Sequence, residues 1–117
     1  MENKGYHRLI AWQKADQLAL MIYQITAKFP NKFFSLISQM QRAALSVPAN
    51  IVEGYSRKSG KEKRRFYNLA YSSLTELEYY IEFCYKIKLY SNATLHKLYS
   101  VQNETAKILS GLSRSTK

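Results

Sequence analysis

The sequence predicts an all-α protein, an antiparallel up-down four-helix bundle, and three observations support this prediction. Apolar residues recur at steps of three and four in four separate stretches, which is the period of one face of an α-helix. The 117 residues include only four Gly and two Pro, too few for the many turns of a β-architecture. Short connections join the four stretches and favour antiparallel neighbours. We expect a single domain over residues 1–117.

The first helix is expected over residues 9–29 and the second over residues 33–57. Pro30 ends the first helix, because proline disfavours helical geometry in the residue before it. Pro48 lies inside the second helix, where it lacks an N–H and its ring crowds the preceding turn, so we expect a kink or two short consecutive helices. The apolar stripe of the second helix is Leu36, Ile37, Met40, Ala43, Ala44, Val47, Ile51 and Val52.

The third helix is expected over residues 61–89 and the fourth over residues 92–113. Ser59 and Glu62 have the spacing of a capping box, in which each side chain accepts a hydrogen bond from an unpaired N–H of the first turn. The expected core stripe of the third helix is Phe66, Leu69, Ala70, Ser73, Leu77, Tyr80, Ile81, Cys84 and Ile87. The expected stripe of the fourth is Leu95, Leu98, Val101, Thr105, Ile108 and Leu112.

Half of the formal net charge of +10 is concentrated in the nine residues Arg57–Arg65, which we call the basic corner. Its cations are Arg57, Lys58, Lys61, Lys63, Arg64 and Arg65, and its one acid is Glu62. Lysine and arginine bind phosphates and release condensed counterions, so this segment is a candidate nucleic-acid-binding site. Cations that open a helix also oppose its macrodipole, which an anion would relieve. The alternative is a solvated corner that keeps a small protein soluble.

Four aromatic residues accompany the basic corner: Tyr55, Phe66, Tyr67 and Tyr71. Aromatic side chains interleaved with cations can stack on unpaired bases. Phe66 also fits the core stripe, however, and Tyr67 and Tyr71 can face a neighbouring helix or subunit. The sequence leaves these alternatives open.

Three polar residues interrupt the second helix. Arg42 and Glu53 are eleven residues apart, so they share a helix face but lie about 16 Å apart along the axis. They are therefore expected to form interhelical or intersubunit salt bridges, or to belong to a ligand site. Asn50 can bridge the backbone that Pro48 opens.

The sequence predicts no catalytic residue, no cofactor and no metal site. Neither histidine, His7 or His96, follows a glutamate by three residues, so the Glu-x-x-His pairs of di-iron bundles are absent. There is no Gly-rich phosphate loop, and the single cysteine, Cys84, falls on the core stripe. The polar N-terminal residues and the short apolar runs predict a cytoplasmic protein with no membrane partner.

Several motifs carry a family resemblance. The most specific is Arg-Ala-Ala-Leu-Ser-Val-Pro-Ala-Asn-Ile-Val-Glu-Gly at residues 42–54, preceded by Gln-Met-Gln at residues 39–41. Trp-Gln-Lys-Ala at residues 12–15, Phe29-Pro30 and Ser-Leu-Thr-Glu-Leu-Glu at residues 73–78 accompany it. With these motifs the chain resembles the four-helix-bundle family encoded by intervening sequences of bacterial large-subunit ribosomal RNA genes.

The resemblance implies an up-down four-helix bundle that assembles into a ring-like homopentamer. The family is similar to the accessory protein of diversity-generating retroelements, which has a basic surface and associates with nucleic acid and a reverse transcriptase. The leading hypothesis is a non-enzymatic oligomer that binds nucleic acid through the phosphate backbone at the basic corner, with RNA as the leading candidate and DNA as the alternative. The alternative is a protein-interaction scaffold or accessory subunit without a direct nucleic-acid role.

Overall fold

The computed structural model describes residues 5–117, and this part of the chain is helical without a strand. Its long helices are α1 (Ile10–Thr26), α2 (Phe34–Ser56), α3 (Gly60–Lys86) and α4 (Asn92–Ser115). Short 3₁₀ turns, η1 (Tyr6–Arg8) and η2 (Asn31–Phe33), precede α1 and α2. Each long helix begins and ends within three residues of its predicted limits. The predicted all-α four-helix fold is confirmed.

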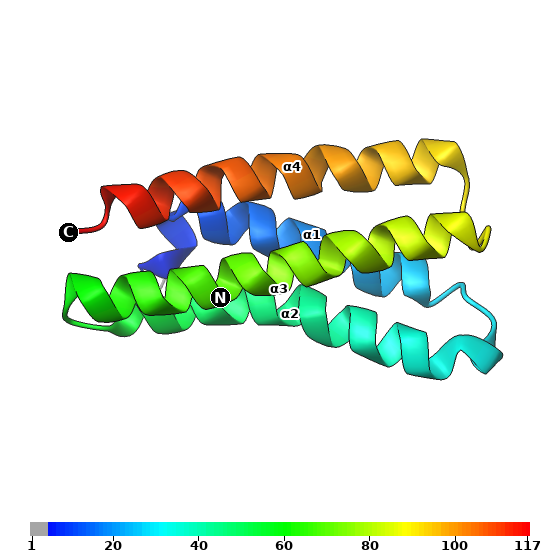
Figure 1. The fold of residues 1–117 in the computed structure, drawn as a ribbon, viewed down its shortest axis with the longest axis horizontal. Coiled ribbons are helices and arrows are strands. Elements are labelled where there is room, and N and C mark those ends of the chain that lie inside the picture. The colour runs from blue at the N-terminus through cyan, green and yellow to red at the C-terminus, as the bar shows by residue number, and fades with distance from the viewer. Residues whose placement is uncertain (1–4) are drawn as a thin grey trace.

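The four helices lie side by side and alternate in direction along a body of 43 × 26 × 21 Å (Figure 1). Each helix contacts the next along the chain, and α4 also contacts α1. This up-down arrangement brings the α2–α3 connection and the end of α4 to the same end of the bundle (Figure 1). None of the described helices combines the length and the apolar composition that a membrane span requires.

The core-facing stripe of α3 is shifted from the predicted one. The buried residues are Tyr67, Ala70, Leu74, Leu77, Ile81 and Cys84. The spacing between them alternates between three and four residues without a break. They therefore form one continuous stripe that faces the other helices along α3. Phe66 and Ser73 are instead only half-buried, and Leu69 and Ile87 are exposed.

Gly54 explains why Tyr67 rather than Phe66 enters the core. A Cβ added at Gly54 would lie 2.6 Å from Cε1 of Tyr67 and 3.1 Å from the carbonyl oxygen of Lys63. The missing side chain therefore leaves space for the Tyr67 ring at the end of α2. The buried residues of α4 are Leu98, Gln102, Thr105 and Leu109, so Gln102 occupies the core position that was predicted for Val101.

Helix α2 runs without interruption through Pro48, which is buried. The alternative of two short helices is therefore wrong, and the expected kink is not confirmed. Near the proline, the Asn50 side-chain amide donates to the Ser46 carbonyl at 2.9 Å. The hydroxyls of Ser46 and Ser73 share a hydrogen bond of 2.8 Å. Polar contacts thus join α2 to α3 beside Pro48.

Serine side chains cap α3 and α4. The Ser59 hydroxyl accepts from the Glu62 N–H at 3.1 Å, and the Ser91 hydroxyl accepts from the Thr94 N–H at 3.3 Å. Only this half of the predicted capping box is confirmed, because the Glu62 carboxylate pairs with Arg65.

Candidate nucleic-acid interface

The basic corner lies at the end of the bundle where three segments of the chain meet. A Cβ at Gly5 would lie 2.8 Å from the Tyr55 hydroxyl, so the N-terminal turn packs against the end of α2. A Cβ at Gly60 would overlap the backbone carbonyl of Lys117, so only glycine allows the C-terminal residues to approach the start of α3 this closely. The corner is therefore built from α2, α3 and both ends of the described chain.

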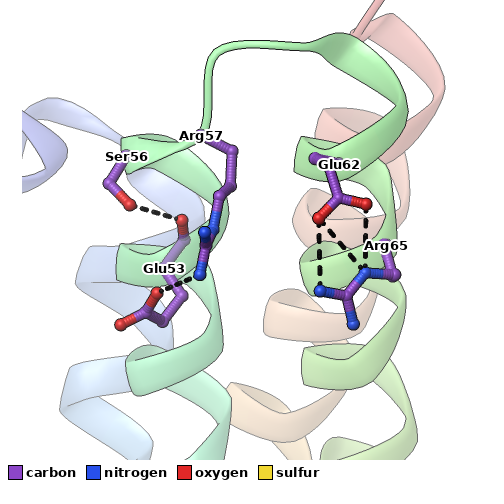
Figure 2. Close-up of polar contacts among 5 residues, drawn as sticks. All are labelled: Glu53, Ser56, Arg57, Glu62 and Arg65. Carbon is purple, nitrogen blue, oxygen red and sulfur yellow. Dashed lines mark hydrogen bonds and ion pairs between the residues drawn. The ribbon is translucent and has the colours of Figure 1, made fainter.

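On the side of the basic corner that faces α2, two of the cations form ion pairs with carboxylates. Nη2 of Arg57 lies 3.0 Å from Oε2 of Glu53, one turn earlier in α2. Nε of Arg65 lies 3.2 Å from Oε2 of Glu62, one turn earlier in α3. Figure 2 shows these two ion pairs on the facing ends of α2 and α3. Both guanidinium groups also lie over the Phe66 ring, 4.6 and 4.4 Å from its centre.

The surroundings of the Glu62 carboxyl group lower its pKa. Its hydrogen bond from Arg65 is the largest cause that lowers its pKa below the ordinary value of 4.5. Desolvation raises the pKa, and the positive charges of Arg65, Arg57 and Lys61 lower it further. At neutral pH the carboxylate is therefore ionised and can pair with Arg65 as the structure shows.

The other four corner cations meet no carboxylate. Nζ of Lys63 donates to the Tyr55 carbonyl at 2.8 Å, and Nη1 of Arg64 donates to the Thr116 carbonyl at 2.8 Å. Lys58 and Lys61 are exposed, and the side chain of neither forms a hydrogen bond or close ion pair with any of residues 5–117. Carbonyl contacts position a cation without removing its charge, so these four side chains keep theirs.

Two further cations come to the corner from α4. Arg114 donates to the Ser110 hydroxyl at 2.8 Å, and Lys117 is exposed beside Gly60. Neither residue was predicted from the sequence as part of the site. A fourth helix antiparallel to the third must nevertheless end beside the start of the third. A groove of about 320 Å³ separates α3 and α4 here, and it is lined by Tyr67, Asn68, Tyr71, Leu109, Ser110, Ser113 and Arg114.

The stretch containing Arg42 borders a different groove, of about 450 Å³, between α2 and α3. There the Tyr80 hydroxyl lies 2.7 Å from Oε2 of Glu76. The Arg42 side chain makes no hydrogen bond or ion pair within the described chain, and Glu53 pairs with Arg57, the residue that follows the last residue of its own helix. The expectation of interhelical salt bridges from Arg42 and Glu53 is wrong for the described residues.

The single cysteine belongs to the hydrophobic core. Cys84 is fully buried beside Met40, and this burial raises the pKa of its thiol to about 11. Within residues 5–117 no three His, Cys, Asp or Glu side chains gather closely enough to hold a metal ion.

Comparison with known proteins identifies the family. The family model described as 23S rRNA-intervening sequence protein matches residues 7–111. A solved structure of a protein with unknown function from the S23 ribosomal protein family of Bacteroides thetaiotaomicron VPI-5482 shares the fold, with a TM-score of 0.82 at 21% identity. The match covers 91% of this chain and 100% of that one. None of the curated proteins matches the chain. The chain belongs to the 23S rRNA-intervening sequence protein family.

Proposed function

We propose that this protein is a non-enzymatic, oligomeric helical bundle that binds nucleic acid through the basic corner, with RNA as the leading candidate for that nucleic acid and DNA as the alternative. The observation that carries the proposal is the set of corner cations without carboxylate partners: Lys58, Lys61, Lys63 and Arg64. A nucleic-acid backbone offers phosphates at regular spacing, and each contact releases counterions. The cytoplasmic location expected from the sequence belongs to the same proposal.

Self-association would strengthen this binding. One corner offers only a few phosphate contacts, and a homopentamer would present five of them to one strand. Binding at the second and later corners then becomes intramolecular, so avidity rises without any new contact. Light scattering of the purified protein at micromolar concentration tests this part, and a monomer would contradict it.

Binding is tested with labelled RNA and DNA between about 50 and 200 mM salt. We expect the logarithm of the affinity to fall linearly with the logarithm of the salt concentration. A variant with Lys58, Lys61, Lys63 and Arg64 changed to Ala should lose most of the binding. The matched control removes four exposed cations from the opposite end of the bundle: Lys28, Lys32, Lys86 and Lys97. No binding at low salt, or equal losses in the two variants, would contradict the proposal.

A second candidate function is a protein-interaction scaffold, and an aromatic surface on α3 favours it. Tyr79 is 58% exposed and Phe83 is 38% exposed, and their ring centres are 6.2 Å apart. Exposed aromatic residues are enriched at protein interfaces. Partners that co-purify after thorough nuclease treatment, and that are lost when Tyr79 and Phe83 become Ser, would support the scaffold.

A further inference from the structure

The groove of about 320 Å³ between α3 and α4, next to the basic corner, combines cations with an exposed aromatic residue. Tyr71 is 42% exposed and lines the groove together with Asn68 and Arg114. Tyr67, by contrast, is 3% exposed and serves the core. No carboxylate lines this groove.

Helical geometry places these groups in order. Lys61, Arg64, Asn68 and Tyr71 follow at steps of three and four, so they share the face of α3 that borders α4. The hydrogen bond from Arg64 to the Thr116 carbonyl shows that this face of α3 is turned towards the end of α4. Tyr71 lies seven residues beyond Arg64, or about 10 Å further along the groove at the usual rise.

The groove also presents unused hydrogen-bonding groups. Oδ1 of Asn68 accepts from the Ser113 hydroxyl at 3.3 Å, while its amide nitrogen donates to no residue of the described chain. Arg114 is held only through its contact with the Ser110 hydroxyl, which leaves further guanidinium N–H groups to donate. A planar ligand lying on Tyr71 would find donors at the groove wall.

A second groove, between α3 and α4 and further from the basic corner, has the opposite charge. Thr75, Glu78, Tyr79, Glu82 and Tyr99 line it, and its two carboxylates repel phosphate. An exposed tyrosine lines each groove, but only Tyr71 is accompanied by a cation. This difference selects the groove beside the corner as the one that suits a nucleotide.

We propose that the groove beside the basic corner holds an unpaired base of single-stranded nucleic acid, stacked on Tyr71. The flanking phosphates lie on Lys61, Arg64, Arg114 and Lys117. This inference rests on the proposed function and names its substrate class. A duplex keeps its bases stacked inside and offers this surface only phosphates, so the protein should bind single strands more tightly than duplexes.

The test measures affinity for three ligands: an oligouridylate of about twelve nucleotides, an abasic strand of the same length, and a duplex. The wild-type protein should bind the oligouridylate most tightly. Tyr71→Leu should weaken that binding by about tenfold and leave binding of the abasic strand and the duplex unchanged. Tyr71→Phe keeps the aromatic ring and should retain the affinity, and Tyr79→Leu is the matched control in the acidic groove.

The outcomes separate the inference from the proposed function. Equal affinity for oligouridylate and abasic strand, or no effect of Tyr71→Leu, overturns base stacking and leaves phosphate binding intact. Binding of none of the three ligands overturns both. Photo-crosslinking of a 5-bromouridine strand to the wild-type protein gives a readout independent of any variant. A crosslink at Tyr71 is expected, and crosslinks found only elsewhere overturn the inference.

Discussion

The two sides of the basic corner carry cations in very different surroundings. Towards α2, Arg57 and Arg65 are each paired with a carboxylate one turn away and pack on Phe66. Towards α4, the Lys61 side chain forms no hydrogen bond or close ion pair with residues 5–117, and Arg64 donates to a carbonyl. A count of charges along the sequence does not distinguish these four cations. In the described part of the chain, only the corner cations on the α2 side are in contact with a carboxylate.

The largest expected difference is between two double variants that remove the same charge. Lys61→Ala with Arg114→Ala removes cations without carboxylate partners and should reduce nucleic-acid affinity at low salt by about tenfold, lowering the salt slope by about one per lost phosphate contact. Arg57→Ala with Arg65→Ala should change affinity and slope less, because Glu53 and Glu62 already compete for those groups. Anisotropy titrations across a salt series measure both, and an equal loss would remove the distinction between the two sides.

The N-cap of α3 should matter to binding, whereas the N-cap of α4 should not. Ser59→Ala and Ser91→Ala each remove a hydroxyl that accepts from the third residue of its helix. Each should lower the free energy of unfolding by about 1 kcal/mol in urea denaturation. Ser59→Ala should also weaken nucleic-acid binding, because fraying of the first turn displaces Lys61 and Arg64. Similar binding by both variants would mean that the start of α3 does not position the cations.

Removing the carboxylates of Glu53 and Glu62 should leave the cations on both sides of the basic corner without a carboxylate partner. Glu53→Gln with Glu62→Gln releases Arg57 and Arg65 while keeping the size of the side chains. We expect tighter binding at low salt and a salt slope steeper by about one for each arginine that gains a phosphate. Glu76→Gln with Glu78→Gln, on the middle of α3, is the control with the same change in charge. If nucleic-acid affinity rose equally in both variants, the cause would be the change in net charge of the whole protein and not the release of Arg57 and Arg65.

The smallest expected effect is a shift in the titration of one carboxyl group. The folded-state pKa of Glu62 lies below 4.5, chiefly because of the hydrogen bond from Arg65. A lowered folded pKa means that the ion pair stabilises the fold above the unfolded pKa and is lost as pH falls through the folded pKa. Carboxyl-carbon NMR should therefore show a midpoint below 4.5 that rises towards 4.5 in Arg65→Ala. An unchanged midpoint would show that the pair does not form in solution.

Much of the fold could be read from the sequence because its signals are local. Helical periodicity, Pro30 and the capping residue Ser59 act within one or two turns, and such local signals placed every long helix to within three residues. The register of α3 could not be read in the same way. Phe66 and Tyr67 are adjacent, both fit a helical stripe, and the space that Gly54 leaves on another helix decides between them.

The candidate site was only partly predictable. The six corner cations are adjacent in sequence, so their concentration was evident. The spacing of four between Glu53 and Arg57, and of three between Glu62 and Arg65, was a signal for ion pairs that the charge count overlooked. Arg114 and Lys117 join the corner through the antiparallel return of α4, which the predicted topology implied but did not place at a residue.

The sequence alone determined that four amphipathic helices form and that a dense group of cations connects the second to the third, because periodicity, caps and charge runs depend on neighbouring residues. Tertiary structure decided which of the cations without carboxylate partners donate to backbone carbonyls of neighbouring segments, and which tyrosine is exposed beside them. Those outcomes depend on side chains brought together from distant parts of the chain, as Arg64 and Thr116 are. No local pattern specifies such contacts.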